Sequence, residues 1–224
     1  MQSTLPTALD DPSTLASAAL QVPHRSVNSI SKRLLDIVGS LVGLLILAIL
    51  FIPLAITIKL DSPGPILYAQ QRYGLLGQPF RIYKFRSMVQ NADDLKSQVK
   101  NEASGLIFKN QDDPRVTKIG RFLRRSSLDE FPQFWNVLLG EMSLVGTRPP
   151  TADEVSRYKP HHWQRLSVKP GMTGEWQVNG RSTVKDFEDI VKLDLRYQAQ
   201  WHPFYDVTLI ARTIYVIVAK VGAF

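Results

Sequence analysis

Asp129 and Glu130 are adjacent carboxylates that follow Arg124 and Arg125 in the sequence. Ser127 and Glu130 match the S-x-x-E capping box, so we expect the acidic pair to lie at the N-terminus of a helix. One interpretation is structural, because acidic residues in a first helical turn offset the helix dipole. The other is chemical, because two adjacent carboxylates cannot both be caps, and one can hold a divalent cation while the other attacks phosphorus. Position alone leaves both interpretations open.

Two further arginines lie in contexts that suit phosphate binding. Arg148 stands in the segment GTRPP and Arg181 in the segment NGR. The guanidinium fork matches phosphate oxygens with two hydrogen bonds, and flanking glycine or proline sets its approach. Arginines near the acidic pair would also keep a carboxylate ionised. Each signal is weak alone, because most surface arginines beside turns are simply solvated.

Other kinds of catalytic site are excluded by residue type or spacing. The chain has no cysteine, which rules out a disulfide scaffold, a thiolate metal site and a cysteine nucleophile. It has no P-loop, GxGxxG or HExxH pattern. His161 and His162 follow Pro160 and fit a surface turn better than a pair of metal ligands. We expect three tryptophans to lie in the core or at the membrane interface rather than to stack on nucleobases, namely Trp163, Trp176 and Trp201.

Residues 37–58 form a run of 22 residues without a charged side chain. As a straight helix this run would rise about 33 Å, enough to cross the hydrocarbon core of a bilayer. Pro53 should bend the helix, and the preceding part of the run rises only about 24 Å. Basic residues flank the run on both sides, which favours a re-entrant helix with both ends on the cytoplasmic face. A kinked single span is the alternative, and Gly39 and Gly43 add a weak helix-packing motif.

The charge of the chain is unevenly distributed. Lysine and arginine number 27 against 20 aspartates and glutamates, and residues 1–58 sum to zero, so the net charge of +7 belongs to residues 59–224. A basic domain beside a membrane attracts phosphate-bearing substrates or anionic lipid. One rival function is therefore a membrane-tethered protein that binds nucleic acid or anionic lipid without turnover. No helix-turn-helix, RNP or zinc-finger pattern supports nucleic acid, and the acidic pair would repel a polyanion without metal.

The hydrophobic patterns predict a mixed α+β fold that is mostly helical. Alternation predicts a small β-hairpin from residues 66–72 and 80–86. Residues 205–221 are apolar but carry three charges, which suits an amphipathic helix in the membrane interface. The remaining expected elements are helices at residues 88–99, 119–125, 153–165 and 184–200, a helix opening at Ser127, and a glycine-rich loop with one short strand at 168–181.

These elements suggest three regions. Residues 1–30 are polar and proline-containing and are expected to be a flexible tail, with a helical turn near residues 15–20. Residues 31–60 hold the re-entrant membrane helix, and residues 61–224 form a catalytic domain on the cytosolic face.

The combination of blocks resembles the bacterial sugar transferases, the monotopic polyprenyl-phosphate phosphoglycosyl transferases. The similarity runs in order over residues 31–224, which argues against a purely structural assembly protein. The matching blocks are SKRLLDIVGS…IKLDSPGP at 31–65, RIYKFRSM at 81–88, DPRVTKIG at 113–120, RFLRRSSLDEFPQFWNVLLGEMSLVGTRP at 121–149, KPGMTGEWQVNGR at 169–181 and LDLRY at 193–197.

The resemblance implies transfer of a hexose-1-phosphate from a UDP-sugar to undecaprenyl phosphate, with release of UMP, at the start of exopolysaccharide or surface glycan synthesis. It implies Mg²⁺ as cofactor, Asp129 as the nucleophile of a covalent phosphosugar intermediate and Glu130 as the main metal ligand. It also implies a monotopic protein on the cytoplasmic face of the bacterial inner membrane, with its helix broken at Pro53. Glucose and galactose are the favoured sugars, and a homo-oligomer is left open. The candidate phosphate- and nucleotide-binding residues are Lys84, Arg86, Arg125, Arg148 and Arg181.

Two positions depart from the family pattern. Ile52 stands where many small members have serine before the helix-breaking proline, so no hydroxyl from that position can satisfy a freed carbonyl. Thr147 replaces a proline of the usual G-P-R-P block, and we expect the loop that carries Arg148 to be less rigid as a result.

Overall fold

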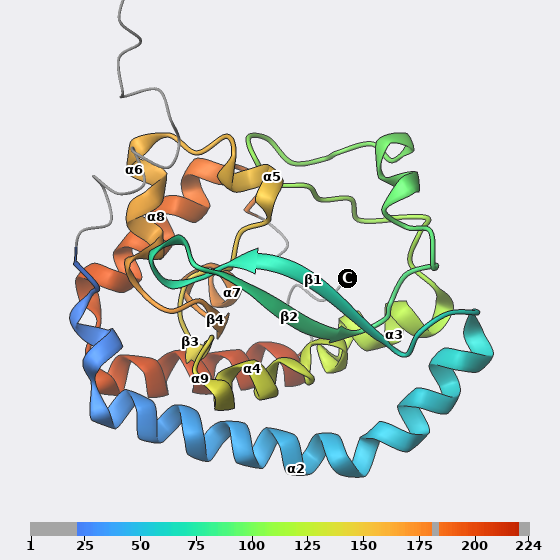
Figure 1. Ribbon diagram of the computed structural model, residues 1–224, viewed down its shortest axis with the longest axis horizontal. Helices are drawn as coiled ribbons and strands as arrows, with labels where there is room; N and C mark the ends of the chain where they lie inside the picture. The colour runs from blue at the N-terminus through green and yellow to red at the C-terminus, as the bar shows by residue number, and fades with distance from the viewer. Residues whose placement is uncertain (1–21, 181–183, 220–224) are drawn as a thin grey trace, which may run out of the picture.

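The computed structural model describes residues 22–180 and 184–219. Over these residues the chain is mostly helical and contains two small two-stranded sheets (Figure 1). This confirms the predicted mixed, mainly helical fold class. The long apolar N-terminal helix lies along one side of the molecule (Figure 1).

Helix α2 (Ile30–Asp61) begins at Ser29, whose hydroxyl accepts a hydrogen bond from the Lys32 amide, and it continues through Pro53. Figure 1 shows the helix axis bending in its C-terminal part. The hydroxyl of Thr57 donates to the Pro53 and Leu54 carbonyls, so a threonine after the proline bonds the backbone there. Helix α2 is long and apolar enough to cross a membrane, and only 11% of its most apolar window is buried in the protein. We conclude that this helix associates the chain with a membrane; its re-entrant course stays a prediction.

The two glycines of the GxxxG motif face the body of the protein. A Cβ at Gly39 would lie 2.4 Å from the Leu144 side chain, and one at Gly43 would lie 2.4 Å from the Phe134 ring. Gly39 and Gly43 therefore let α2 approach strand β3 (Ser143–Val145) and helix α4 (Gln133–Leu139) closely. The motif serves packing within this chain.

Strands β1 (Leu67–Tyr73) and β2 (Pro79–Phe85) form the predicted antiparallel hairpin. Tyr68 pairs with Lys84 in its register, so alternate residues of both strands share one face. The connection contains the short 3₁₀ turn η2 (Leu75–Gly77), in which Leu76 and Gly77 have positive φ angles of 53° and 74°. Glycine adopts such angles without strain, whereas leucine does so only at a cost.

The structure contradicts two of the predicted helices. The expected helix at residues 88–99 is a loop with a single 3₁₀ turn, η3 (Asp94–Gln98). The expected helix at 153–165 is divided into α5 (Ala152–Val155), α6 (Pro160–Trp163) and the 3₁₀ turn η5 (Gln164–Ser167). Pro160 causes this division, because proline lacks the amide donor of a helix interior and fits the first helical position instead.

Helices α3 (Lys118–Arg125), α8 (Phe187–Gln200) and α9 (Pro203–Val218) correspond to predicted helices. Strand β3 was not predicted; it pairs in parallel with β4 (Gly171–Thr173), the short strand expected in the glycine-rich loop, which continues into α7 (Glu175–Val178). The main core lies between these strands and α4, α8 and α9, around Val137, Met142 and Leu209. Trp163 and Trp201 are buried, as expected for core residues.

Part of the predicted N-terminal tail is attached to the body. The 3₁₀ turn η1 (Arg25–Asn28) precedes α2. The His24 amide donates to the Ser167 carbonyl at 2.8 Å, and the Arg25 guanidinium donates to the Trp201 carbonyl at 2.6 Å. The helical turn expected near residues 15–20 lies outside the described residues.

Candidate active site

The acidic pair lies in a cavity of about 1770 Å³ enclosed by the hairpin, by residues 86–116, and by parts of α2, α4, α7 and α9. Asp129 and Glu130 belong to the 3₁₀ turn η4 (Leu128–Glu130), which precedes α4. The predicted capping box is wrong, because Ser127 adopts a left-handed conformation (φ 55°) and makes no capping hydrogen bond. Pro132 occupies the position before α4 instead. The carboxylates are therefore not helix caps, and both line the cavity.

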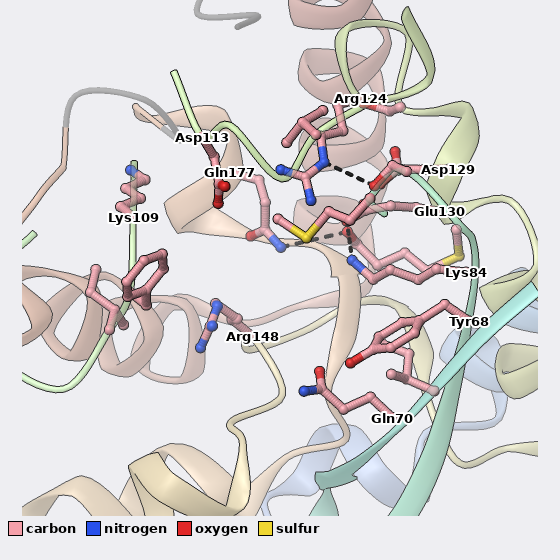
Figure 2. A pocket seen from close by; sticks show the side chains of 18 of the residues that line it. Tyr68, Gln70, Lys84, Lys109, Asp113, Arg124, Asp129, Glu130, Arg148 and Gln177 are labelled. Atoms are coloured by element: carbon pink, nitrogen blue, oxygen red, sulfur yellow. Dashed lines mark hydrogen bonds and ion pairs between the residues drawn. The ribbon is translucent and has the colours of Figure 1, made fainter. Parts of the chain in front are cut away.

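Glu130 and Lys84 form an ion pair in this cavity, with 2.8 Å between Oε1 and Nζ. Both side chains are about one quarter exposed, whereas Asp129 is buried. Figure 2 shows Lys84, Glu130, Asp129 and Arg124 close together. The structure thus brings together the two carboxylates and the lysine that we expected in the site.

The hairpin supplies Lys84 together with three more side chains on the same face. Tyr68, Gln70 and Arg72 on β1 line the cavity, as the alternation of the strand requires. The Arg72 guanidinium donates to the Pro149 carbonyl at 3.0 Å and to the Gln70 amide oxygen at 3.0 Å. Burial, and next the nearby Arg148 charge, lower the pKa of Arg72 to about 10. Arg72 remains a cation at neutral pH and adds to the positive potential of the cavity.

Arg148 is held by a two-point ion pair with the buried Glu154. Arg148 Nη1 lies 2.8 Å from Glu154 Oε2, and Nη2 lies 3.0 Å from Oε1. Burial alone would raise the pKa of Glu154, but the charge and hydrogen bonds of Arg148 lower it. Glu154 Oε2 also accepts the Thr151 amide in a capping box that opens α5. The carboxylate therefore fixes the direction of an arginine that lines the cavity.

Two hydrogen bonds tether the loop that carries Arg148. The buried Thr147 donates its hydroxyl to the Arg165 carbonyl at 3.0 Å, and the Arg165 guanidinium donates to the Arg148 carbonyl at 3.2 Å. Arg165 is itself buried and bonded to Asp194. The threonine hydroxyl therefore gives the loop a tether that a proline could not, and the expected lower rigidity of the loop stays a prediction.

Arg86 lines the cavity, and its side chain is also bonded to the backbone near the end of α2. It is buried, and its guanidinium donates to the carbonyls of Pro65, Ser62 and Ile58. These are carbonyls at and just beyond the C-terminal end of α2, where a cation is favourable. Arg86 thus holds the end of the membrane helix, and its part in phosphate binding stays a prediction.

Arg125 is exposed and lines the cavity, as predicted for a substrate-binding residue. Arg181 lies outside the described residues. The cavity residues missing from the predicted set include Arg124, which donates to the Ser87 hydroxyl at 2.9 Å, and Lys109, which donates to the Val184 carbonyl at 3.0 Å. Both belong to the basic stretch at residues 109–125, so the charge run was the available signal.

Trp176 joins two of these cations. Lys109 Nζ lies 5.6 Å from the centre of the Trp176 ring, and the Arg148 guanidinium carbon lies 5.9 Å from it. The ring also packs on the cluster around Phe187. It therefore combines a core contact with a place in the cavity wall, where cation–π attraction orients two positive side chains.

The acidic pair suits a divalent cation that binds through oxygen. Mg²⁺ takes one or two protein carboxylates and completes its shell with water and substrate phosphate oxygens. Asp129 and Glu130 supply such carboxylates in a cavity of about 1770 Å³, and Glu130 already pairs with the Lys84 ammonium. Asp113 does not join them, because it is bonded to Arg115 at Nε and Nη2.

A second group of possible ligands lies elsewhere, on α6 and α8. His161 Nε2 and His162 Nε2 lie 3.1 and 2.9 Å from the Glu188 carboxylate. The Lys159 amide donates to His162 Nδ1 at 3.0 Å, so the proton of a neutral His162 is on Nε2 and points at Glu188. A metal on Nε2 would need that proton on Nδ1, against the Lys159 N–H. The cluster is therefore a polar link between helices and not the surface turn that was expected.

The chain is similar in sequence to several known proteins. Residues 27–220 match the family model described as bacterial sugar transferase. The chain is 50% identical over 196 residues to the galactosyl transferase CpsE of Streptococcus agalactiae, covering 87% of this chain and 43% of the relative. It is 40% identical over 200 residues to the UDP-glucose:undecaprenyl-phosphate glucose-1-phosphate transferase of Escherichia coli, covering 86% and 41%. It is 36% identical over 220 residues to the exopolysaccharide production protein ExoY of Sinorhizobium fredii, covering 93% and 97%. The chain spans less than half of the first two relatives and nearly all of the third.

Proposed function

This chain belongs to the bacterial sugar transferase family, and from that membership we propose that it transfers a hexose-1-phosphate from a UDP-sugar to undecaprenyl phosphate and releases UMP. The observation that carries the proposal is the placement of Asp129 and Glu130 in one large cavity with Lys84, beside an apolar helix suited to a membrane. The names of the relatives support both substrates and a role in exopolysaccharide production.

We propose that Asp129 is the nucleophile. A carboxylate oxygen of Asp129 attacks the sugar-bearing phosphorus of the UDP-sugar, and the bond from that phosphorus to the bridging oxygen breaks, so that UMP leaves with the bond electrons. A phosphate oxygen of undecaprenyl phosphate then attacks the same phosphorus. The bond to Asp129 breaks, the carboxylate is regenerated, and the product is an undecaprenyl diphosphate sugar. Atoms and charge balance without any further reactant.

Glu130 is the proposed ligand for Mg²⁺, which would neutralise charge on the diphosphate and on the departing UMP. Lys84 bonds Glu130 and can reach phosphate oxygens in the same cavity. Arg148 and Arg125 approach from other walls, and Arg124 and Lys109 add to the set. These cations are held by several different elements around the cavity. Their positive charges are therefore already in place to stabilise the negative charge that develops on the diphosphate during the reaction.

The membrane placement is proposed as well. Helix α2 would enter the cytoplasmic leaflet of the bacterial inner membrane and return near Pro53, so that residues 61–224 lie on the cytoplasmic face. The apolar side chains that α2 and α9 expose, such as Ile49 and Phe204, fit that interface. A monotopic site suits the reaction, because the UDP-sugar is soluble and the lipid phosphate is confined to the leaflet.

A panel of UDP-sugars tests the proposal. Purified full-length chain in detergent is incubated with undecaprenyl phosphate, MgCl₂ and each UDP-sugar, and UMP release is measured. We expect UDP-glucose or UDP-galactose to give the highest rate, and no UMP without undecaprenyl phosphate beyond one equivalent per enzyme. Absence of UMP release with every sugar would contradict the proposed function.

A further inference from the structure

The cavity that holds Asp129 and Glu130 has a second, apolar limb. Phe134 on α4, Val42 on α2 and Ile214 on α9 line the same cavity as the two carboxylates. Phe131 follows Glu130 directly, and its ring lies 5.3 Å from that of Phe134 in an edge-to-face arrangement. An apolar wall therefore begins beside the acidic pair and extends towards the long helix.

This limb opens on the apolar side of the molecule. Val42 and Ile214 line the cavity and are also 54% and 58% exposed, so they stand at its mouth. Their neighbours Leu45 and Val218 are exposed on the outer surfaces of α2 and α9. Figure 1 shows α2 and α9 along the same side of the protein. The mouth thus faces the surface that the long apolar helix would place in lipid.

The chemistry of the limb separates two substrates. A nucleotide, a hexose and a diphosphate carry many hydrogen-bonding groups, and burial of these groups against Phe134, Ile210 and Ile214 would remove water from them without returning hydrogen bonds. An isoprenoid chain has no hydrogen bonds with water to lose there, and the transfer of its apolar surface out of water is favourable. The polar region around Lys84 and Arg148 fits the first group, and the apolar limb fits the second.

We propose that the apolar limb between α2, α4 and α9 binds the first isoprene units of the undecaprenyl phosphate acceptor. The phosphate end then points at Asp129, and the rest of the chain continues through the mouth between Val42 and Ile214 into the bilayer. This inference rests on the proposed function. It assigns separate routes to the two substrates: the UDP-sugar enters from water and the lipid from the leaflet.

Kinetics of matched variants test the assignment. Ile214→Trp would fill the limb, whereas Val207→Trp places the same side chain on an exposed position of α9 that does not line the cavity. We expect Ile214→Trp to raise the KM for undecaprenyl phosphate at least five-fold, with the KM for the UDP-sugar within two-fold of wild type. Val207→Trp should leave both constants unchanged. The pair Val42→Trp and Leu45→Trp repeats the comparison on α2.

An unchanged KM for undecaprenyl phosphate in both Ile214→Trp and Val42→Trp would overturn the assignment. An equal rise of the KM for undecaprenyl phosphate and the KM for the UDP-sugar would also overturn it. A wild-type chain that releases no UMP would instead contradict the proposed function itself, so the two failures are distinguishable.

Photocrosslinking gives a readout that does not depend on turnover. Benzoylphenylalanine replaces Ile214 in one variant and Val207 in another, and each full chain is irradiated with radiolabelled undecaprenyl phosphate. We expect at least five-fold more label at position 214, lost on addition of unlabelled undecaprenyl phosphate and kept with an equal excess of phosphatidylglycerol. Equal labelling at both positions, or loss of label with phosphatidylglycerol, would show a general lipid contact and overturn the proposal.

Discussion

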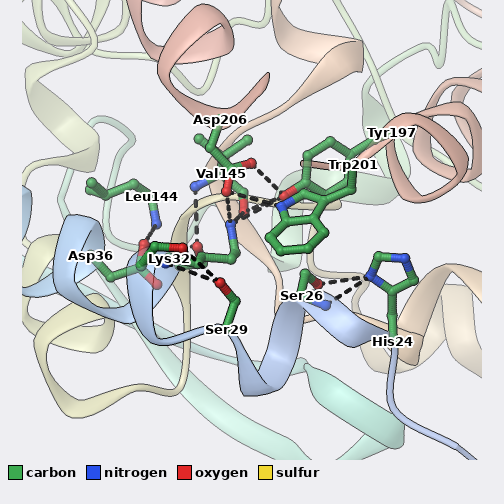
Figure 3. Close-up of polar contacts among 12 residues, drawn as sticks. His24, Ser26, Ser29, Lys32, Asp36, Leu144, Val145, Tyr197, Trp201 and Asp206 are labelled. Carbon is green, nitrogen blue, oxygen red and sulfur yellow. Dashed lines mark hydrogen bonds and ion pairs between the residues drawn. The ribbon is translucent and has the colours of Figure 1, made fainter. Parts of the chain in front are cut away.

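Lys32 Nζ lies 2.8 Å from Asp206 Oδ2, and this buried ion pair joins the first turn of α2 to the first turn of α9. The Tyr197 hydroxyl and the Trp201 indole nitrogen also donate to Asp206, at 2.8 and 3.1 Å (Figure 3). Burial, and next the Asp206 charge, raise the pKa of Tyr197, so its phenol stays protonated and donates. Lys32 donates further to the Val145 carbonyl on β3 at 2.8 Å. One network therefore holds the membrane helix, the parallel strand pair and the last helix together.

We expect Lys32→Met to lower the free energy of unfolding by about 3–5 kcal/mol, because it leaves the Asp206 carboxylate buried without its cation. The measurement is thermal or chemical unfolding of the purified chain in detergent. The control is Lys192→Met, which removes an exposed partner of Asp189 and should have no measurable effect. Equal stability of Lys32→Met and wild type would show that the network does not hold the helices together.

Much of the site could be predicted from residue types. The alternation in the hairpin places Lys84 on a definite face, and the adjacency of Asp129 and Glu130 marks them whatever the local backbone. The detail of η4 could not be predicted, because S-x-x-E fits a cap at Ser127 equally well until Pro132 is seen to occupy the position before α4. The residue types of the site could thus be predicted from the sequence, whereas the backbone conformation that positions them could not.

Charge alone could not separate binding arginines from structural ones. Arg86 and Arg124 both lie in basic stretches and both line the cavity, yet the Arg86 guanidinium donates to backbone carbonyls around the end of α2, while that of Arg124 donates to the Ser87 hydroxyl. Their difference depends on tertiary contacts. Strand β3 was missed for a similar reason, because it has three residues and its partner β4 begins 28 positions after the start of β3.

We expect Asp129→Asn to abolish transfer, because an amide is a poor nucleophile towards phosphorus. The measurement is exchange of radiolabelled UMP into the UDP-sugar without lipid acceptor, together with steady-state UMP release. Asp189→Asn, at an exposed carboxylate on α8 that does not line the cavity, serves as control and should keep wild-type rates. Exchange at the wild-type rate in Asp129→Asn would remove this residue from the covalent step.

We expect Glu130→Gln to shift the MgCl₂ concentration that gives half-maximal activity upward by at least ten-fold. A neutral amide oxygen binds a hard cation more weakly than a carboxylate does. The measurement is a metal titration of UMP release at saturating substrates. An unchanged titration curve in a folded variant would exclude Glu130 as a metal ligand.

Glu154 should act through Arg148. In Glu154→Gln the two-point ion pair with Arg148 is lost, so the guanidinium is less well directed into the cavity. We expect the KM for the UDP-sugar to rise about five- to twenty-fold, in keeping with the loss of a charge-assisted hydrogen bond. Thr151→Ala, which removes only the hydroxyl cap of α5, should lower stability while leaving KM close to wild type. A rise of KM in both variants would indicate a general disturbance of α5.

The stability of the protein should fall as the pH decreases from 7 to 5. Burial lowers the pKa of His162, so the unfolded chain takes up a proton near the ordinary histidine pKa while the folded chain does not. Hydrogen bonds from His162 and His161 lower the pKa of Glu188 to about 2, so this carboxylate stays charged over the same range. His162→Gln should flatten the dependence of melting temperature on pH between 7 and 5. The same slope in the variant and the wild type would assign it to other groups.

Cysteine labelling can decide the course of α2, because the chain has no cysteine of its own. Asn28 and Leu60 are exposed at the two ends of the helix, so Asn28→Cys and Leu60→Cys should fold and react with maleimide. If the helix returns to the cytoplasmic face near Pro53, as the basic residues on both flanks predict, an impermeant maleimide labels neither cysteine in intact cells and both in inverted membrane vesicles. A cysteine placed at a known periplasmic site of another membrane protein controls for access. Labelling of one of the two positions in intact cells would establish a crossing helix and contradict the re-entrant course.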